Sequence, residues 1–363
     1  MLVKRFFACL LALALLVGML SGCAAKPSET AAEPMVLFTD SLGRKVGIPV
    51  SLTRVAPSGA VASMFLAVVA PEYMSTINAT PSSSQYRYLN PRLIGLPTTG
   101  QMYGSKSTLN LESILTSGAQ VVIDLGDKKD NMAADLDALQ RQIGMPVIFI
   151  EADLPHMAEA YRTLGKILSG KEARGEELAA FVDETVSLAE ENAAKIQDSE
   201  RLSVLYTSGS SGLNTDAKGS TQAQVLDLMG LENAAVVEDV SNKGGGNPIN
   251  LEQLYRFDPD VILFTAGSTY STAADDEAWQ PLRAIEEGDF YEIPSMPYNW
   301  LSNPPSLNML LGIWWLGNLL YPQYYDYDMV EKTQEIFQLF WDYDLSGEEA
   351  RQMLANSTLK DTP

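Results

Sequence analysis

The stretch LNLESIL at residues 109–115, followed by VVI at 121–123, returns as INLEQLY at 249–255, followed by VIL at 261–263. The spacing is the same in both copies, and the offset between them is 140 residues throughout. In each copy an asparagine can cap a helix that a short turn connects to a buried strand. A repeat this long indicates two related α/β lobes, because solenoid repeats have periods of about 20–50 residues.

The rest of the chain alternates short β-like runs with helical stretches, which is typical of α/β architecture. We expect strands within residues 54–57, 121–124, 147–150, 202–206 and 261–265. These runs are apolar on both faces, as parallel strands are when helices cover each side of the sheet. Near the C-terminus, helices are expected over 306–320, 328–343 and 347–354, and Ser346 with Glu349 predicts a capping box for the last of them.

A long helical zone separates the two copies of the repeat. Asp153 and Pro155 are typical of a helix start, whereas Gly165 and Gly170 weaken the middle of the zone. Residues 171–197 are rich in Ala, Glu, Leu and Lys, and as a helix they would span about 40 Å at 1.5 Å per residue. We therefore expect a stiff helical connector and only slight closure of the lobes around a ligand.

The N-terminus predicts export and a lipid anchor. Lys4 and Arg5 precede an apolar run of about fifteen residues, which is short for a membrane-spanning helix and typical of a secretory signal. The sequence LSGC at 20–23 resembles the bacterial lipobox, whose cysteine is lipidated and becomes the new N-terminus. We therefore predict a signal peptide over residues 1–22, a lipidated Cys23, and a flexible tether over residues 23–35.

The composition excludes several functional classes. The 46 acidic residues outnumber the 25 basic ones and give a formal charge of −21, so nucleic-acid binding is not expected. One histidine and two cysteines argue against zinc fingers, Cys/His proteases and a bare-metal site built from histidines. No catalytic residues, metal ligands or cofactor are predicted, and the composition favours a binding protein.

At this point the chain resembles the substrate-binding lipoproteins of iron-chelate and vitamin B12 ABC importers. The resemblance rests on FTDSLGRKV at 38–46, on the two Asn-x-Glu helices, and on PSLNMLLGIWWL at 305–316, LYP at 320–322 and FWDY at 340–343. It implies two Rossmann-like α/β lobes joined by one long helix, with the ligand in a cleft between the lobes. The corresponding boundaries are an N-terminal lobe over 36–169, a connecting helix over 170–199 and a C-terminal lobe over 200–363.

The resemblance also implies a partner and a way of binding it. One glutamate on each lobe of these proteins pairs with arginines of the membrane permease, and the matching residues here are Glu112 and Glu252. A monomeric, membrane-anchored receptor that meets ABC permease subunits is the expected arrangement. From the sequence alone, each glutamate is equally explained by the preference of a helix N-terminus for negative charge.

Ligands of two-lobed α/β proteins bind at the loops that leave the carboxyl ends of the strands. These loops contain aromatic and basic side chains that suit a planar or catecholate-bearing chelate of net negative charge. The candidate ligand-binding residues are Tyr86, Arg87, Tyr88, Tyr103, Lys106, Tyr270, Tyr298 and Trp300. Lys128 and Lys243 also lie in these loops, whereas His156 lacks any His or Cys partner and is not expected to bind metal.

The predicted function is capture of a metal chelate outside the membrane, foremost a ferric siderophore, and its delivery to an ABC permease. A haem or corrinoid receptor of the same family and a sensory or adhesive lipoprotein are the alternatives. An esterase or glycosidase is disfavoured, because SGSSG at 208–212 lacks the nucleophile spacing and His156 is poorly placed as a base.

Overall fold

The computed structural model describes residues 33–104, 108–242 and 244–359. Residues Val36–Pro363 form one compact unit, and the account below concerns that unit. The predicted signal peptide and Cys23 lie outside the described residues. Within the described part of the chain, no helix is both long and apolar enough to cross a membrane.

The first lobe is built on a parallel sheet of three strands in the order β3-β4-β5. These are β3 (Val55–Pro57), β4 (Val121–Gly126) and β5 (Val147–Glu151). The chain enters through β1 (Met35–Thr39) and β2 (Lys45–Pro49), which form a separate two-stranded sheet. The helices of this lobe are α2 (Ala60–Val69), α3 (Ser83–Tyr86), α4 (Leu111–Thr116), α5 (Met132–Ile143) and α6 (Met157–Ile167).

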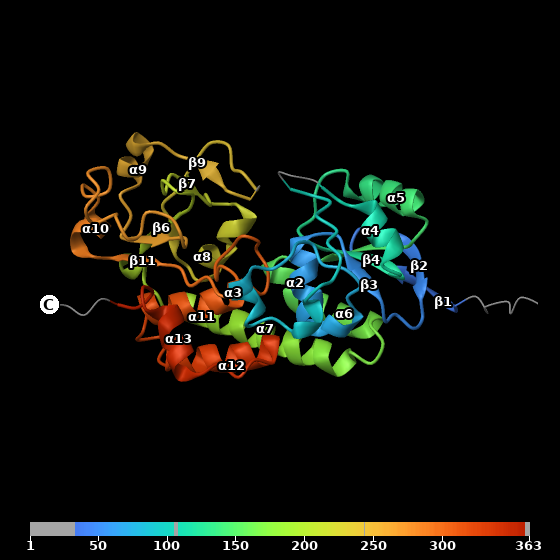
Figure 1. Ribbon diagram of the computed structural model, residues 1–363. Helices are drawn as coiled ribbons and strands as arrows, with labels where there is room; N and C mark the ends of the chain where they lie inside the picture. Colours follow the sequence, from blue (N-terminus) through green and yellow to red (C-terminus); the bar gives the residue numbers. More distant parts are fainter. Residues whose placement is uncertain (1–32, 105–107, 243, 360–363) are drawn as a thin grey trace, which may run out of the picture. The chain divides into compact units, whose positions relative to one another are not determined.

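The second lobe carries a parallel sheet of four strands in the order β11-β10-β6-β8. These are β6 (Ser203–Thr207), β8 (Glu232–Asn233), β10 (Val261–Phe264) and β11 (Phe290–Glu292), while β7 (Asn214–Thr215) and β9 (Asn247–Pro248) pair antiparallel beside them. Its helices are α8 (Gln224–Leu228), α9 (Leu251–Phe257) and α10 (Arg283–Glu287). Figure 1 shows this lobe in yellow and orange and the first lobe in blue, cyan and green. The five strands expected from the sequence are confirmed, with ends shifted by up to two residues.

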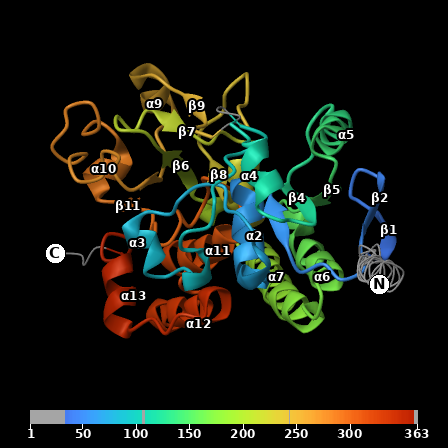
Figure 2. The same ribbon diagram turned by 45° about the vertical axis from the view of Figure 1, so that its right-hand side comes forward.

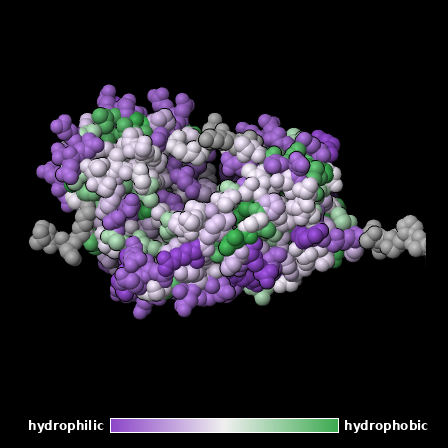
Figure 3. All heavy atoms as spheres, in the orientation of Figure 1, coloured by the Kyte–Doolittle hydropathy of each residue, from purple (hydrophilic) through white to green (hydrophobic). Residues whose placement is uncertain are grey.

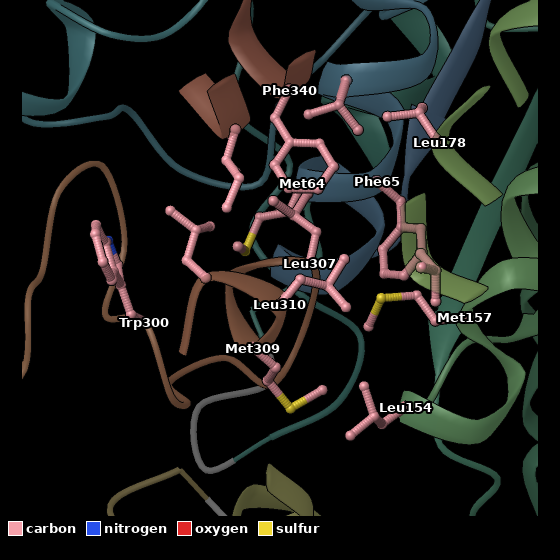
Figure 4. Packing of buried hydrophobic residues seen from close by; sticks show 14 of the residues in the cluster. Met64, Phe65, Leu154, Met157, Leu178, Trp300, Leu307, Met309, Leu310 and Phe340 are labelled. Atoms are coloured by element: carbon pink, nitrogen blue, oxygen red, sulfur yellow. The ribbon is translucent and has the colours of Figure 1, made fainter. Parts of the chain in front are cut away.

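Each parallel sheet is buried on both faces, as its apolar runs predict. Along β4, Val121 and Ile123 face the large central cluster of buried apolar residues, whereas Val122 faces a smaller cluster beneath α4 and α5. In β10, Leu263 faces the central cluster and Ile262 the cluster that contains Leu254 of α9. The central cluster thus runs continuously from one lobe to the other (Figure 4), which joins the two sheets through a shared core.

Long helices on one side of the unit connect the lobes (Figure 1). They are α7 (Glu172–Ala193), which is the expected connector, together with α11 (Asn308–Leu320) and α12 (Met329–Trp341). The last helix, α13 (Gly347–Leu354), begins with the predicted capping box between Ser346 and Glu349. Single turns of 3-10 helix occur at Pro71–Tyr73, Pro91–Leu93, Leu154–His156, Asp198–Glu200 and Thr221–Ala223.

The two asparagine caps predicted in the repeat are also confirmed, whereas the predicted helix start at Asp153 has no side-chain cap. Asn110 accepts a hydrogen bond from the Ser113 N–H at 3.1 Å, and Asn250 accepts one from the Gln253 N–H at 2.9 Å. The two copies of the repeat therefore form equivalent units, α4–β4 and α9–β10. Asp153 does not cap the turn that follows it, because its carboxylate pairs instead with Nδ1 of His156.

The opening turn, Asp40 to Arg44, fastens the hairpin to β5. Asp40 Oδ1 accepts the N–H groups of Leu42 and Arg44 at 3.0 and 2.9 Å, and Gly43 supplies the positive φ of 77° that the turn requires. The Arg44 guanidinium pairs with Asp40 at 2.9 Å and donates to the Val147 carbonyl at 3.1 Å. This part of the motif therefore has a structural role, since it ties the opening hairpin to β5.

Helices α6 and α7 pack closely where two glycines face each other (Figure 2). A Cβ on Gly175 would lie 2.6 Å from the Tyr161 carbonyl oxygen and 2.7 Å from Cα of Gly165. Gly165 therefore does not interrupt the helical zone. It permits a close antiparallel contact, and the zone divides at Gly170, which has a φ of +67°.

Gly175→Ala is expected to destabilise the protein by about 2 kcal/mol, because the added methyl group meets backbone atoms that cannot move aside. Helix propensity alone gives the opposite sign, about 1 kcal/mol of stabilisation. Gly347→Ala in α13, where the nearest atom to a new Cβ is 3.5 Å away, is the matched control and should be neutral or stabilising. Urea unfolding of both variants checks this, and a more stable Gly175→Ala protein would contradict the packing argument.

Candidate solute-binding site

A pocket of about 210 Å³ lies between the two lobes and is lined by residues from both. Figure 3 shows the hollow there, with hydrophilic side chains at its rim. The first lobe contributes the start of α2, the end of β4 and segments near Gln101 and Asp127, and the second contributes Thr221, Gln222, Asn242 and residues 303–305. This is the edge to which the carboxyl ends of β3 and β4 lead, as expected for an α/β binding site.

Helix α2 points its N-terminus into this pocket. Its N-cap is Gly59, which offers no side chain, and its first turn contains no acidic residue. The first intrahelical bond runs from the Ser63 N–H to the Gly59 carbonyl at 3.0 Å, so the N–H groups of Ala60, Val61 and Ala62 are not used within the helix. This end of α2 favours negative charge beside it.

Asp124, near the end of β4, supplies that negative charge. Its side chain is buried within an otherwise apolar strand and lines the pocket. The Ser58 hydroxyl, next to the N-cap of α2, donates to Oδ1, whereas Oδ2 has no hydrogen-bond partner among the described residues. Burial raises the pKa of Asp124 to about 6, although the Ser58 hydrogen bond and the nearby Lys129 oppose the shift.

The second lobe places a further acceptor in the same pocket. Gln222 is 7% exposed, and its Oε1 has no partner within the described part of the chain. Asn242 holds the preceding residue, because its Oδ1 accepts the Thr221 N–H at 2.8 Å. Both acceptors, Asp124 Oδ2 and Gln222 Oε1, are therefore available to a hydrogen-bond donor on a ligand in this pocket.

Among the predicted ligand residues, Tyr103 lines the pocket. Lys129 lies 5.3 Å from its ring centroid, and burial raises the pKa of its hydroxyl, with Asp124 and Asp135 adding to the shift. Lys106 and Lys243 lie outside the described residues. The pocket lining also includes Ser58, Asn242 and Asn303.

The other predicted aromatic residues are packed elsewhere. Tyr88 meets Phe337 and Tyr343 edge to face, with ring centroids 5.6 and 5.1 Å apart, and Tyr270 packs against Phe264 and Phe290. Trp300 is completely buried, and its indole N–H donates to the Met296 carbonyl at 2.9 Å (Figure 4).

Tyr86 and Tyr298 are half-buried and likewise outside the pocket lining. Tyr298 packs against the central cluster, and burial raises its pKa to about 12. Arg87 pairs with Glu349 of α13. The segment around α3 therefore holds the first lobe against the C-terminal helices.

The basic residues of the predicted ligand loops that the structure describes are already paired. Besides Arg87, Lys128 pairs with Glu151 at 2.6 Å and Lys129 with Asp127 at 3.1 Å. The described part of the pocket is therefore not strongly electropositive. Lys128 and Lys129 each lie beside a carboxylate of the same pocket region or of β5.

Sequence reasoning missed Asp124 and Gln222. Asp124 had a signal, since it is an acidic residue inside the buried run VVIDLG. Gln222 had none, because its burial depends on contacts between segments far apart in the sequence.

His156 lies close to Asp153 and Glu151, and these three residues are of the types that bind metal ions. The Asp153 carboxylate pairs with His156, however, and the Glu151 carboxylate pairs with Lys128.

The two predicted docking glutamates are exposed at equivalent positions. Both occupy the first turn of their helices, α4 and α9, which lie on the side of the unit away from α7 and α12 in Figures 1 and 2. Glu252 is 83% exposed and pairs with Arg256 one turn later at 2.9 Å. Glu112 makes no ion pair with the residues that the structure describes.

Two parallel-sheet lobes, a helical connection and a polar pocket between the lobes define a solute-binding receptor of the kind used in ABC import, which is not an enzyme. Residues 70–297 match the periplasmic binding protein family, and the chain belongs to it. Such proteins work outside the cytoplasm.

Solved structures give the same fold over most of the chain. An ABC transporter solute binding protein from Sulfurospirillum deleyianum is 26% identical, with a TM-score of 0.80 over 88% of this chain and 99% of that one. A periplasmic solute binding protein from Veillonella parvula is 21% identical, with a TM-score of 0.72 over 89% and 98%. The molybdate periplasmic binding protein MolA of Haemophilus influenzae is 18% identical, with a TM-score of 0.69 over 86% and 99%. No curated protein sequence matches significantly.

Proposed function

We propose that this protein is the membrane-anchored receptor of an ABC importer for a metal chelate. It binds the chelate between its lobes and presents it to the permease through Glu112 and Glu252. The observation that carries the proposal is the pocket itself, which is lined by both lobes and contains buried polar atoms that lack partners within the described residues. A solute that satisfies both sides holds the lobes together, which gives the permease a signal that the receptor is loaded.

A ferric siderophore is the proposed solute, with haem and corrinoids as alternatives. Proteins of similar fold come from an Fe³⁺-hydroxamate transport system of Saccharomonospora viridis and include the heme-binding RhuT of Roseiflexus. The pocket of about 210 Å³ is smaller than the usual range of about 300–1,000 Å³ for organic ligands. One part of a whole siderophore therefore enters the pocket, and the rest lies outside it.

The proposal is tested by calorimetric titration of residues 24–363 with ferric hydroxamates, ferric catecholates, ferric citrate, haem, cobalamin, molybdate, zinc and manganese. The described tryptophans are buried, so heat is a better signal than fluorescence. Saturable sub-micromolar binding of one chelate supports the proposal, whereas binding of free metal alone contradicts it. Uptake of the bound solute into vesicles that carry the permease and its ATPase distinguishes a transport receptor from a sensory or adhesive lipoprotein.

Cys23→Ala is expected to release the protein from the membrane, because lipidation at Cys23 is the proposed anchor. Cell fractionation and mass spectrometry of the mature N-terminus check this. The intact chain of the variant should bind solute as the unmodified protein does. A variant that remains in the membrane fraction at the original level would show that the anchor lies elsewhere.

A further inference from the structure

The unpartnered atoms of the pocket carry information about the solute. On the first lobe Asp124 Oδ2 lacks a partner, and on the second lobe Gln222 Oε1 lacks one, among the residues that the structure describes. Both side chains are more than nine-tenths buried, at 4% and 7% exposure, and both line the same pocket. A carboxylate oxygen accepts hydrogen bonds only, and so does the amide oxygen of Gln222. The Tyr103 hydroxyl, which also lines this pocket without a partner among the described residues, can accept or donate.

The charge around the pocket points the same way. Among the described residues, Lys129 pairs with Asp127 and Lys128 with Glu151, so each of these two cations already has a carboxylate beside it. The first N–H groups of α2 favour a negative charge beside them, and the Ser58 hydroxyl, next to the N-cap of α2, holds the Asp124 carboxylate near this helix end. A solute anion in this pocket would face a buried carboxylate.

We infer that the pocket receives a hydrogen-bond-donating group of neutral or positive charge, an ammonium or a metal-bound amine or hydroxyl, which Asp124 and Gln222 hold from opposite lobes. This inference rests on the proposed receptor function and narrows its solute. It reverses the sequence-based expectation of an anionic chelate. Because the two acceptors belong to different lobes, the same donor group also links the lobes in the loaded state.

Two inert metal complexes of similar size and opposite character test the inference. Hexaamminecobalt(III) carries three positive charges and presents only N–H donors, whereas hexacyanoferrate(III) carries three negative charges and presents only acceptors. Both exchange their ligands slowly, so the protein reads their outer surface without coordinating the metal. Titration by calorimetry at low and physiological salt is expected to show one saturable site for the cobalt complex and none for the ferricyanide.

Variants separate this site from general attraction to an acidic protein. Gln222→Met removes the acceptor without changing net charge and is expected to weaken cobalt binding about ten-fold or more. Asp124→Asn should weaken it by about ten- to a hundred-fold, whereas Glu191→Gln, an exposed site on α7 with the same loss of charge, should leave it unchanged.

Three results would overturn the inference. They are tighter binding of hexacyanoferrate(III), absence of a saturable site for the cobalt complex, and cobalt binding that Asp124→Asn and Gln222→Met leave intact. None of them decides the receptor function, which depends on uptake through the permease. Failure of uptake with intact cobalt binding would contradict the proposed function and leave the site assignment standing.

Discussion

The double variant Glu112→Ala, Glu252→Ala is expected to reduce solute uptake through the permease by about a hundred-fold or more, while solute binding stays unchanged. Both carboxylates are exposed and lie outside the pocket lining, so their removal leaves the solute contacts intact. A charge-assisted pair with an arginine contributes about 1.5–3 kcal/mol, which corresponds to about ten-fold or more for each lobe. Uptake into vesicles and calorimetric titration of the same preparations measure the two quantities separately.

The single variants should differ from each other. Glu252 is held by Arg256 in the free receptor, and that pair must open before Glu252 meets the permease, whereas Glu112 has no such competitor among the described residues. Glu112→Ala is therefore expected to reduce uptake more than Glu252→Ala. Glu191→Ala on α7 is the control for the loss of an exposed carboxylate. Normal uptake by the double variant would show that the permease binds another surface.

Local signals account for what the sequence predicted well. The strands are apolar on both faces because helices cover them. A run of five or six apolar residues in the sequence is enough to indicate such a strand. Asn110 and Asn250 each accept a hydrogen bond from the backbone N–H three residues later, so these caps depend only on neighbouring sequence. Because the same local pattern occurs twice, 140 residues apart, it also predicts two related lobes.

The less successful predictions concern residues whose neighbours are far away in the sequence. Tyr88 was expected near the ligand because it follows a loop at the strand ends, yet it packs against Phe337 of α12. Nothing near Tyr88 in the sequence indicates that the C-terminal helices return to the first lobe. The same applies to Trp300, which lies in the shared core.

Residue type alone indicates aromatic and basic side chains as ligand contacts, and it does not indicate buried hydrogen-bond acceptors. Asp124 and Gln222 are informative because their oxygens lack partners among the described residues, a property that only coordinates reveal. The pairing of Lys128 with Glu151 is equally invisible in a list of basic residues. The sequence therefore predicts loops that include part of the candidate pocket's lining, whereas the partners of their polar atoms are visible only in the structure.

Asp124→Asn and Asp216→Asn are each expected to stabilise the solute-free protein at pH 8, by up to about 3 kcal/mol. Burial raises the pKa of both carboxyls to about 6 from the ordinary value of 3.8, so each native carboxylate is held at a cost. Asparagine keeps an oxygen for the hydroxyl that donates to each aspartate, Ser58 for Asp124 and, at 2.7 Å, Ser302 for Asp216. Urea unfolding at a series of pH values measures the effect.

The sign of the pH dependence distinguishes this cause from a simple gain in packing. Between pH 4 and 6 the native protein holds protons on Asp124 and Asp216 that the unfolded chain has released, so the wild type gains stability as pH falls through 6. The advantage of each asparagine variant should therefore shrink towards pH 4. The other groups that act on Asp124 are Lys129, Asp127 and Tyr103, which all remain in the variant.

Asp260 provides the opposite case within the same fold. Burial alone raises its pKa, but hydrogen bonds from Ser203 and Arg283 outweigh that effect and leave the pKa below its ordinary value. Asp260→Asn should destabilise the protein at neutral pH, and the difference should disappear as pH falls through the native pKa of Asp260. Equal pH dependence in all three variants would show that the buried aspartates are not held as costly charges. In that case the cost of burying the Asp124 charge would no longer explain why this carboxylate binds a hydrogen-bond donor.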